Sequence, residues 1–140
     1  IERLGACDLW LHAGDFYRDA LELHRLYGIP LVAVVGNCDQ VTGPEEELLE
    51  LEGVSVLLTH GHLYRVKFGY GQIVARAQKV GAKLVVFGHT HQPEDVVVEG
   101  VRLFNPGSLS RTRNPAGLCA GVITIGGGDI NTAFYRPEYL

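Results

Sequence analysis

The sequence predicts an α/β domain in the form of a two-sheet sandwich, and two observations favour this fold class. Up to Asp95, short apolar runs alternate with amphipathic stretches that have the three- and four-residue spacing of a helix. Beyond Asp95, apolar runs follow one another across glycine turns without a helical stretch between them, as in β-hairpins. Strand–helix alternation followed by hairpins is typical of an α/β layer with an antiparallel end. The length of 140 residues fits one domain with one core.

Each expected element has a signal of its own. Two helices, over residues 18–27 and 70–80, carry apolar residues on one face and are followed by Gly28 and Gly81, which are typical C-caps. A short acidic helix is expected over residues 45–51, after Pro44. Apolar runs bounded by glycine or turn residues predict strands. The expected strands cover residues 8–13, 31–35, 54–59, 84–87, 96–99, 101–104, 118–125 and 130–135.

The composition excludes several classes of protein. Hydrophobic residues make up 46% and charged residues 20%, a balance that gives a buried core and not a disordered chain. The net charge of −4 argues against a protein that grips a nucleic-acid polymer through its overall field. The apolar runs are too short to span a bilayer and the chain does not open on an export signal, so no membrane association is expected. Three cysteines without a disulfide rhythm favour a reducing, cytoplasmic location.

Polar residues follow four of the expected strands, each time beside glycine. They lie at residues 14–15, 36–39, 60–62 and 88–91, and the intervals between them approach one strand–helix–strand step. If these strands are parallel, all four groups emerge at the same edge of the sheet, where open α/β sheets bind ligands. Glycine beside each group allows sharp turns and a close approach of the backbone to an ion.

The residue types at this edge favour a transition-metal site. Aspartate, asparagine and histidine together form a mixed oxygen and nitrogen shell, which suits Mn²⁺, Fe²⁺, Ni²⁺ or Zn²⁺ better than Ca²⁺. No pair of cysteines has zinc-finger spacing. A carboxylate such as Asp15 can bridge two cations held about 3.5–4 Å apart, the separation used in two-metal hydrolysis.

Each of these residues also has an ordinary structural interpretation. Asp15 alone is most often a turn residue, and His60 alone most often caps a strand or bonds a backbone carbonyl. His89 and His91, two apart in a segment expected to be extended, project to the same side and are more suggestive of ligands. His62 is close enough to support the site, although a loop hydrogen bond explains it equally well. Ligand-type residues after four successive strands favour a metal site over four unrelated turns.

Five short motifs occur in order along the chain: GDF at residues 14–16, GNCD at 36–39, THGH at 59–62, GHTH at 88–91 and NPGS at 105–108. In these motifs the chain resembles the calcineurin-like metallophosphoesterases, most closely their small bacterial and archaeal phosphodiesterase branch, which is itself similar to Vps29. The resemblance covers residues 1–140 and implies a single phosphoesterase domain with the metallo-dependent phosphatase-like fold. That fold is a four-layer α/β sandwich of two mixed β-sheets flanked by helices.

The resemblance also implies two divalent metal ions, with Mn²⁺ first and Ni²⁺, Fe²⁺ or Zn²⁺ as other candidates. The implied ligands are Asp15, which bridges both ions, Asn37, His60 and His89 around one ion, and His91 at the other. Asn37, Cys38 and Asp39 form the implied catalytic motif, in which Asn37 also contacts the substrate phosphate. The implied function is a divalent-metal-dependent phosphodiesterase, in which a hydroxide that bridges the metals attacks a small phosphodiester.

Two departures from the family pattern bear on catalysis. Cys38 stands where many members carry a histidine near the leaving group, and a thiol is a weaker proton donor at pH 7. We therefore expect phosphodiesters with good leaving groups as substrates, although Cys38 is equally well explained as a small packed loop residue. No Asp-x-His precedes Asp15, and the sequence starts at Ile1 and contains no methionine. We expect the native protein to carry this segment upstream; without it the domain lacks its first strand, and one metal keeps only Asp15 and His91.

Two alternatives to an enzyme stay open. One is a non-catalytic, Vps29-like protein-interaction module with a vestigial metal site, although the intact GNCD and GHTH motifs argue against it. The other is a structural protein with a single metal. Arg111 and Arg113 can steer an anionic substrate or simply form a basic surface loop, and the surface loop is favoured. A homo-oligomer is compatible with the expected hairpins.

Overall fold

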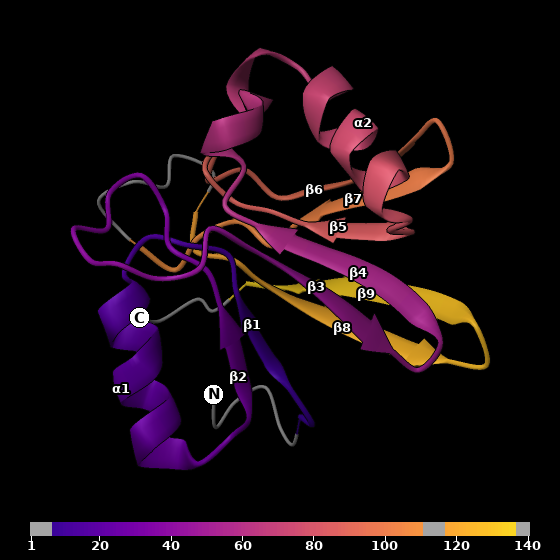
Figure 1. Cartoon of the computed structure of the whole chain (residues 1–140). Helices are drawn as coiled ribbons and strands as arrows, with labels where there is room; N and C mark the ends of the chain where they lie inside the picture. The colour runs from indigo at the N-terminus through magenta and orange to yellow at the C-terminus, as the bar shows by residue number, and fades with distance from the viewer. Residues whose placement is uncertain (1–6, 111–116, 137–140) are drawn as a thin grey trace.

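The structure, a computed structural model, describes residues 7–110 and 117–136 (Figure 1). Arg111 and Arg113 therefore lie outside the described residues. The elements, in chain order, are β1 (Trp10–His12), α1 (Tyr17–Tyr27), β2 (Leu31–Ala33), β3 (Glu46–Leu51), β4 (Val54–Thr59), η2 (His62–Tyr64), η3 (Val66–Phe68), α2 (Gly71–Val80), β5 (Leu84–Val86), β6 (Glu94–Val98), β7 (Val101–Asn105), β8 (Ala120–Gly126) and β9 (Asp129–Tyr135).

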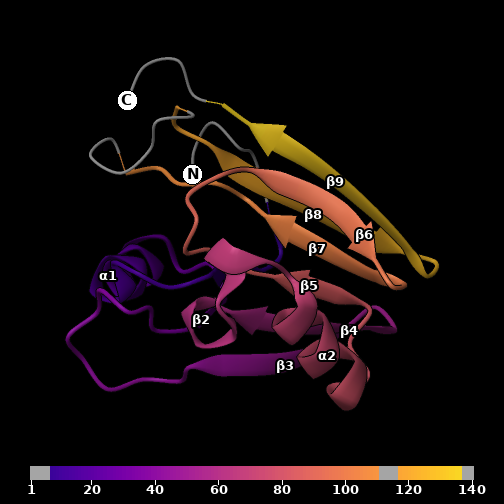
Figure 2. The same cartoon turned by 90° about the horizontal axis from the view of Figure 1, so that it is seen from above.

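These elements stack in layers, which Figure 1 and Figure 2 show from two directions. A five-stranded mixed sheet has the order β3-β4-β5-β7-β6, and α2 covers one of its faces. The parallel pair β1–β2 and the antiparallel hairpin β8–β9 lie against the other face, and α1 packs beside β2. The predicted mixed α/β sandwich is confirmed. Among the described residues, two separate strand pairs, β1–β2 and β8–β9, stand in place of the expected second sheet.

Two apolar clusters fill the spaces between the layers. On one face of the sheet, Ile73 and Val74 of α2 pack in a cluster with Leu57 of β4. On the other face, Val56 and Leu58 of the same strand pack towards β1, β2, β8 and β9. Successive side chains of a strand point to opposite faces, so one apolar run serves both clusters. All five side chains are fully buried, and burial of each stabilises the fold by about 1.5–3 kcal/mol.

Strand direction within the layers determines where the polar loops emerge. Strands β1 and β2 are parallel to each other, and β4, β5 and β7 are also parallel. The loops after parallel neighbours leave from the same end of their layer, as the sequence predicts for the four polar groups. The remaining neighbours, β3–β4, β6–β7 and β8–β9, are antiparallel hairpins.

The prediction of a short helix over residues 45–51 is wrong, because Glu46–Leu51 form strand β3. This segment pairs antiparallel with β4, and its Leu49 and Leu51 pack against the buried cluster. A two-residue turn closes the hairpin, and the φ angles of its residues Glu52 and Gly53 are 49° and 79°. Two positive φ values are what the tight hairpin turn requires. Pairing and burial thus override the helix propensity of glutamate and leucine.

The other expected elements are present, with ends that differ by a few residues. Both predicted helices end at the expected glycines, Gly28 and Gly81, which adopt left-handed φ angles of 69° and 77°. The two C-terminal hairpins expected beyond Asp95 are β6–β7 and β8–β9. In the described part of the chain, no helix has the length and apolar character needed to cross a membrane.

Candidate metal centre

The loops after β1, β2, β4 and β5 meet in the structure. The backbone N–H of Cys38 donates to Oδ1 of Asp15 at 3.0 Å and joins the first two loops. The backbone N–H of Gly88 donates to the carbonyl oxygen of His60 at 2.9 Å and joins the other two. The imidazole of His60 connects the pairs, since its Nδ1 lies 2.7 Å from the carbonyl oxygen of Ala13. The structure therefore gathers the four polar groups at one place.

Asp15 lies at the centre of this place. It is buried, and its φ of 60° lies in the left-handed region, which costs a non-glycine residue about 1–2 kcal/mol. Strain of this kind concentrates at functional sites. Two glycines make room for the crowding: a Cβ on Gly36 would stand 2.3 Å from Oδ1 of Asp15, and a Cβ on Gly14 would stand 2.6 Å from Nδ1 of His60. Gly36 and Gly14 are therefore required because a side chain at either position would collide with Asp15 or His60.

His60 is held in one tautomer by its surroundings. A carbonyl oxygen only accepts, so the contact with Ala13 places the proton on Nδ1. Nε2 then carries a lone pair, and it lies 3.0 Å from Oδ1 of Asn37 and 3.6 Å from Oδ2 of Asp15. Burial lowers the pKa of the His60 imidazole, which keeps the ring neutral at pH 7. Three lone-pair donors of different residues thus face one another.

His89 and His91 complete the cluster, but the expectation of an extended segment is wrong. Their φ angles of 70° and 59° are left-handed, so the chain turns at each histidine. The ring centroid of His89 lies 5.0 Å from that of His60, and Nε2 of His91 lies 3.9 Å from Oδ2 of Asp15. Both rings reach the centre by turns of the backbone and not by alternation along a strand.

His62 belongs to this cluster more closely than the sequence analysis indicated. Its ring centroid lies 5.3 Å from that of His60 and 6.1 Å from that of His89. Its Nδ1 is buried and is without a hydrogen-bond partner among the described residues. The HxH spacing in THGH resembles that of GHTH, and this similarity is the sequence signal that could have placed His62 in the candidate set.

The GNCD loop contributes its residues in different ways. Asn37 presents Oδ1 to His60, whereas Cys38 is exposed and contacts Asp15 through its backbone. Asp39 accepts the backbone N–H of Tyr17 on Oδ1 at 2.9 Å and that of Gly36 on Oδ2 at 2.8 Å. Asp39 thereby ties the start of α1 to the loop after β2. The catalytic roles of Asn37, Cys38 and Asp39 stay predictions.

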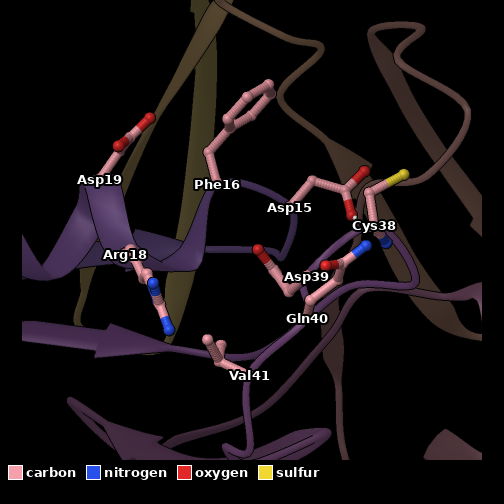
Figure 3. A pocket seen from close by; sticks show the side chains of 8 residues that line it. All are labelled: Asp15, Phe16, Arg18, Asp19, Cys38, Asp39, Gln40 and Val41. Atoms are coloured by element: carbon pink, nitrogen blue, oxygen red, sulfur yellow. Dashed lines mark hydrogen bonds between the residues drawn. The ribbon is translucent and has the colours of Figure 1, made fainter.

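A pocket of ≈ 420 Å³ opens beside Asp15 and is lined by residues 15–16, 18–19 and 38–41. Figure 3 shows Asp15 and Cys38 close together at one end of this pocket, with Arg18 extending towards Val41. The volume is in the range of small-molecule sites. Arg18 brings the positive charge to a lining that otherwise contains carboxylates and uncharged groups.

The donor set fits a divalent transition metal. Asp15, Asn37 and the neutral His60 point lone pairs at one another, an arrangement that a cation stabilises. The bond from His60 Nδ1–H to a backbone carbonyl is the kind of contact that orients metal-binding histidines in proteins. Within residues 7–110 and 117–136, no three His, Cys, Asp or Glu side chains stand arranged to hold an ion as they are. Metal binding therefore requires these side chains to rearrange from the positions that they have here.

The ionisation of His89 gives a first testable prediction. Burial, followed by the nearby His60, lowers the pKa of His89 from 6.5 to about 4. In the unfolded chain His89 takes up a proton as the pH falls below 6.5, whereas in the folded protein it stays neutral until about 4. The metal-free protein is therefore expected to lose stability between these pH values, and a His89→Gln variant to lose less. Urea unfolding with EDTA at several pH values, with imidazole NMR titration, measures both; titration of His89 near 6.5 would contradict the prediction.

Comparisons with known proteins identify the family of the chain. The model of the calcineurin-like phosphoesterase superfamily domain matches residues 1–128. The probable metallophosphoesterase YsnB of Bacillus subtilis is 33% identical over 129 residues, which cover 91% of this chain and 75% of YsnB. The phosphodiesterase YfcE of Escherichia coli K12 is 37% identical over 98 residues, 61% of this chain and 49% of YfcE.

A solved structure with the same fold is wild-type Vps29 of Entamoeba histolytica in complex with Zn²⁺. Its TM-score is 0.77 at 19% identity, with 96% of this chain and 86% of that chain covered. At this identity the likeness shows the fold alone. The domain match over residues 1–128 and the 33% identity to YsnB show that the chain belongs to the calcineurin-like phosphoesterase superfamily.

Proposed function

We propose that this protein is a divalent-metal-dependent phosphodiesterase. The observation that carries the proposal is the orientation of His60, whose Nδ1–H donates to Ala13 and whose Nε2 lone pair points at Asn37 and Asp15. Family membership supports a phosphoesterase, and the phosphodiesterase YfcE among the relatives supports diesters as the substrate class.

Two sets of donors would hold the metals. Asp15 with Asn37, His60 and His89 would bind one divalent ion, and Asp15 with His91 would contribute to a second. When bound, such ions lower the pKa of a water molecule and neutralise charge on the phosphoryl group. Mn²⁺ is the first candidate, and Ni²⁺, Fe²⁺ and Zn²⁺ are others, because a mixed oxygen and nitrogen shell accepts all of them.

The residues of the chain provide orientation and substrate contact. The backbone N–H of Cys38 donates to Oδ1 of Asp15, and Oδ2 of Asp15 faces His60 and His91. The exposed amide of Asn37 can donate to a phosphate oxygen. The pocket beside Asp15 takes the ester group that leaves, and the guanidinium of Arg18 is the cationic group on its wall that can contact a phosphate oxygen.

A small phosphodiester with a good leaving group is the substrate we propose. Cys38 lines the pocket at the position where a stronger proton donor would otherwise assist the departing oxygen, and a thiol gives little such assistance at pH 7. The net charge of −4 disfavours a nucleic-acid polymer as the substrate.

Hydrolysis of bis(p-nitrophenyl) phosphate tests the proposal. With the full-length protein that carries this chain, we expect turnover in the presence of Mn²⁺, its loss after EDTA, and its return when Mn²⁺ is restored. p-Nitrophenyl phosphate, the matched monoester, is expected to react more slowly. A folded full-length protein that contains no stoichiometric transition metal and shows no metal-stimulated turnover would overturn the proposal and favour a Vps29-like interaction module.

A further inference from the structure

Asn105, the last residue of β7, is hydrogen-bonded to the loop that carries His89 and His91. Its side chain is fully buried. Its Nδ2 donates to the carbonyl oxygen of Gly88 at 3.1 Å and to Oγ1 of Thr90 at 3.0 Å. Its Oδ1 accepts the backbone N–H of Gly107 at 2.9 Å. Both donor hydrogens and the acceptor of the amide are thus used inside the protein.

The loop requires such support because its backbone is strained. His89 and His91 both have positive φ angles, and each such residue costs about 1–3 kcal/mol, which surrounding contacts must offset. Thr90, between the two histidines, bonds to Asn105 and also accepts the backbone N–H of Gln92 on Oγ1 at 3.3 Å. The loop is therefore fastened through Thr90, while His89 and His91 reach His60 and Asp15.

An asparagine suits this position better than its isosteric relative. An aspartate would keep an acceptor for Gly107 but would bring a second oxygen against the carbonyl oxygen of Gly88. A buried acceptor facing another acceptor loses the hydrogen bond and adds repulsion. The amide donor is the property that the loop uses.

We propose that Asn105 is a positioning residue which, through Thr90 and Gly88, holds His89 and His91 in the conformation needed to bind metal. The inference rests on the proposed function, since the hydrogen bonds of Asn105 matter for catalysis only if His89 and His91 bind a metal. Partners that orient metal ligands typically change metal affinity or activity by about 10–100-fold when removed.

Two variants test the inference from both ends of the hydrogen bond. Asn105→Asp removes the donor, and Thr90→Val removes the acceptor while it keeps the side-chain shape. Thr90→Ser restores the hydroxyl and is expected to behave like the wild type. Thr132→Val is the matched control, because Thr132 also bonds through its hydroxyl, to Arg102 at 2.7 Å, but lies on β9 outside the candidate site.

The readouts separate positioning from general stability. In the full-length protein we expect Asn105→Asp and Thr90→Val to weaken Mn²⁺ affinity, measured by calorimetry, about 10–100-fold. Excess Mn²⁺ should restore much of kcat, and KM at saturating Mn²⁺ should change little. In the metal-free protein, the imidazole NMR signals of His89 and His91 should shift in both variants, while those of the exposed His24 stay unchanged.

Each outcome has a distinct meaning. Wild-type Mn²⁺ affinity in Thr90→Val, or a loss of activity that excess Mn²⁺ does not restore, would overturn the positioning role. If Asn105→Asp does not fold, the Mn²⁺ affinities of Thr90→Val and Thr90→Ser alone decide whether the positioning role holds. If the wild type itself binds no Mn²⁺, the proposed function fails, and unchanged histidine signals in the metal-free Thr90→Val protein would then overturn the positioning role separately.

Discussion

Replacement of Asp15 by asparagine is expected to lower kcat/KM by about 1,000-fold and to abolish stoichiometric metal binding in the full-length protein. A metal at a phosphoryl centre supplies several kcal/mol of transition-state stabilisation. About 4 kcal/mol corresponds to about three powers of ten in rate. Asp15→Asn keeps the side-chain shape and the acceptor for the Cys38 N–H but removes the charge that faces His60 and His91.

The same variant is expected not to destabilise the metal-free protein. Oδ2 of Asp15 now faces the Nε2 lone pair of a neutral His60, and an amide N–H in its place donates to that lone pair. Loss of activity with an unchanged or higher thermal midpoint in EDTA is therefore the signature of a functional residue. Asp129→Asn, at the exposed start of β9, is the control with the same change in net charge. Near-normal metal-stimulated activity in Asp15→Asn would contradict the assignment of Asp15.

Replacement of Gly36 by alanine is expected to damage both the site and the fold. The new Cβ would stand 2.3 Å from Oδ1 and 2.6 Å from the backbone nitrogen of Asp15, and backbone does not move aside like a flexible side chain. A shift of about 1 Å at a catalytic group costs about 100-fold in rate. Overpacking of this kind costs about 1–3 kcal/mol of stability. Steady-state kinetics and thermal unfolding measure the two effects.

Gly126→Ala is the matched control for this substitution. Gly126 ends β8, also has no positive φ, and meets nothing within 4 Å of an added Cβ. We expect it to leave the activity and the thermal midpoint close to those of the wild type. If Gly36→Ala were as active and as stable as Gly126→Ala, the close approach of the loops after β1 and β2 would be wrong.

Much of the fold could be predicted because local and long-range signals agree. Residues 54–59 are β-branched or apolar at every position except Ser55, and the structure has β4 over the same residues. The prediction of a helix over residues 45–51 was wrong because glutamate and leucine favour helices locally, whereas strand β3 depends on pairing with β4. The Glu52-Gly53 turn was the available signal, since Glu99-Gly100 closes the β6–β7 hairpin with the same two residue types and positive φ angles.

The sequence predicted which metal-binding side chains the candidate site contains, but not how they are oriented. Asp15 and His60 each follow a strand beside a glycine, and this pattern predicts that they lie at one edge of the sheet and bind a metal. In the structure, Nε2 of His60 lies 3.6 Å from Oδ2 of Asp15. The tautomer of His60 depends on the carbonyl of Ala13, which lies 47 residues away in the sequence. His89 and His91 have left-handed backbone, which is uncommon for residues other than glycine, so an extended segment was the natural expectation. The orienting contact responsible, from Asn105, is visible only after folding.

Anomalous X-ray diffraction from crystals of the full-length protein grown with Mn²⁺ shows directly whether Asp15 and His60 bind a metal ion. We expect a manganese peak at coordination distance from Asp15 and from Nε2 of His60, with Nδ1 of His60 still bonded to the carbonyl of Ala13. A well-ordered crystal in saturating Mn²⁺ with no anomalous peak beside these two side chains would contradict it.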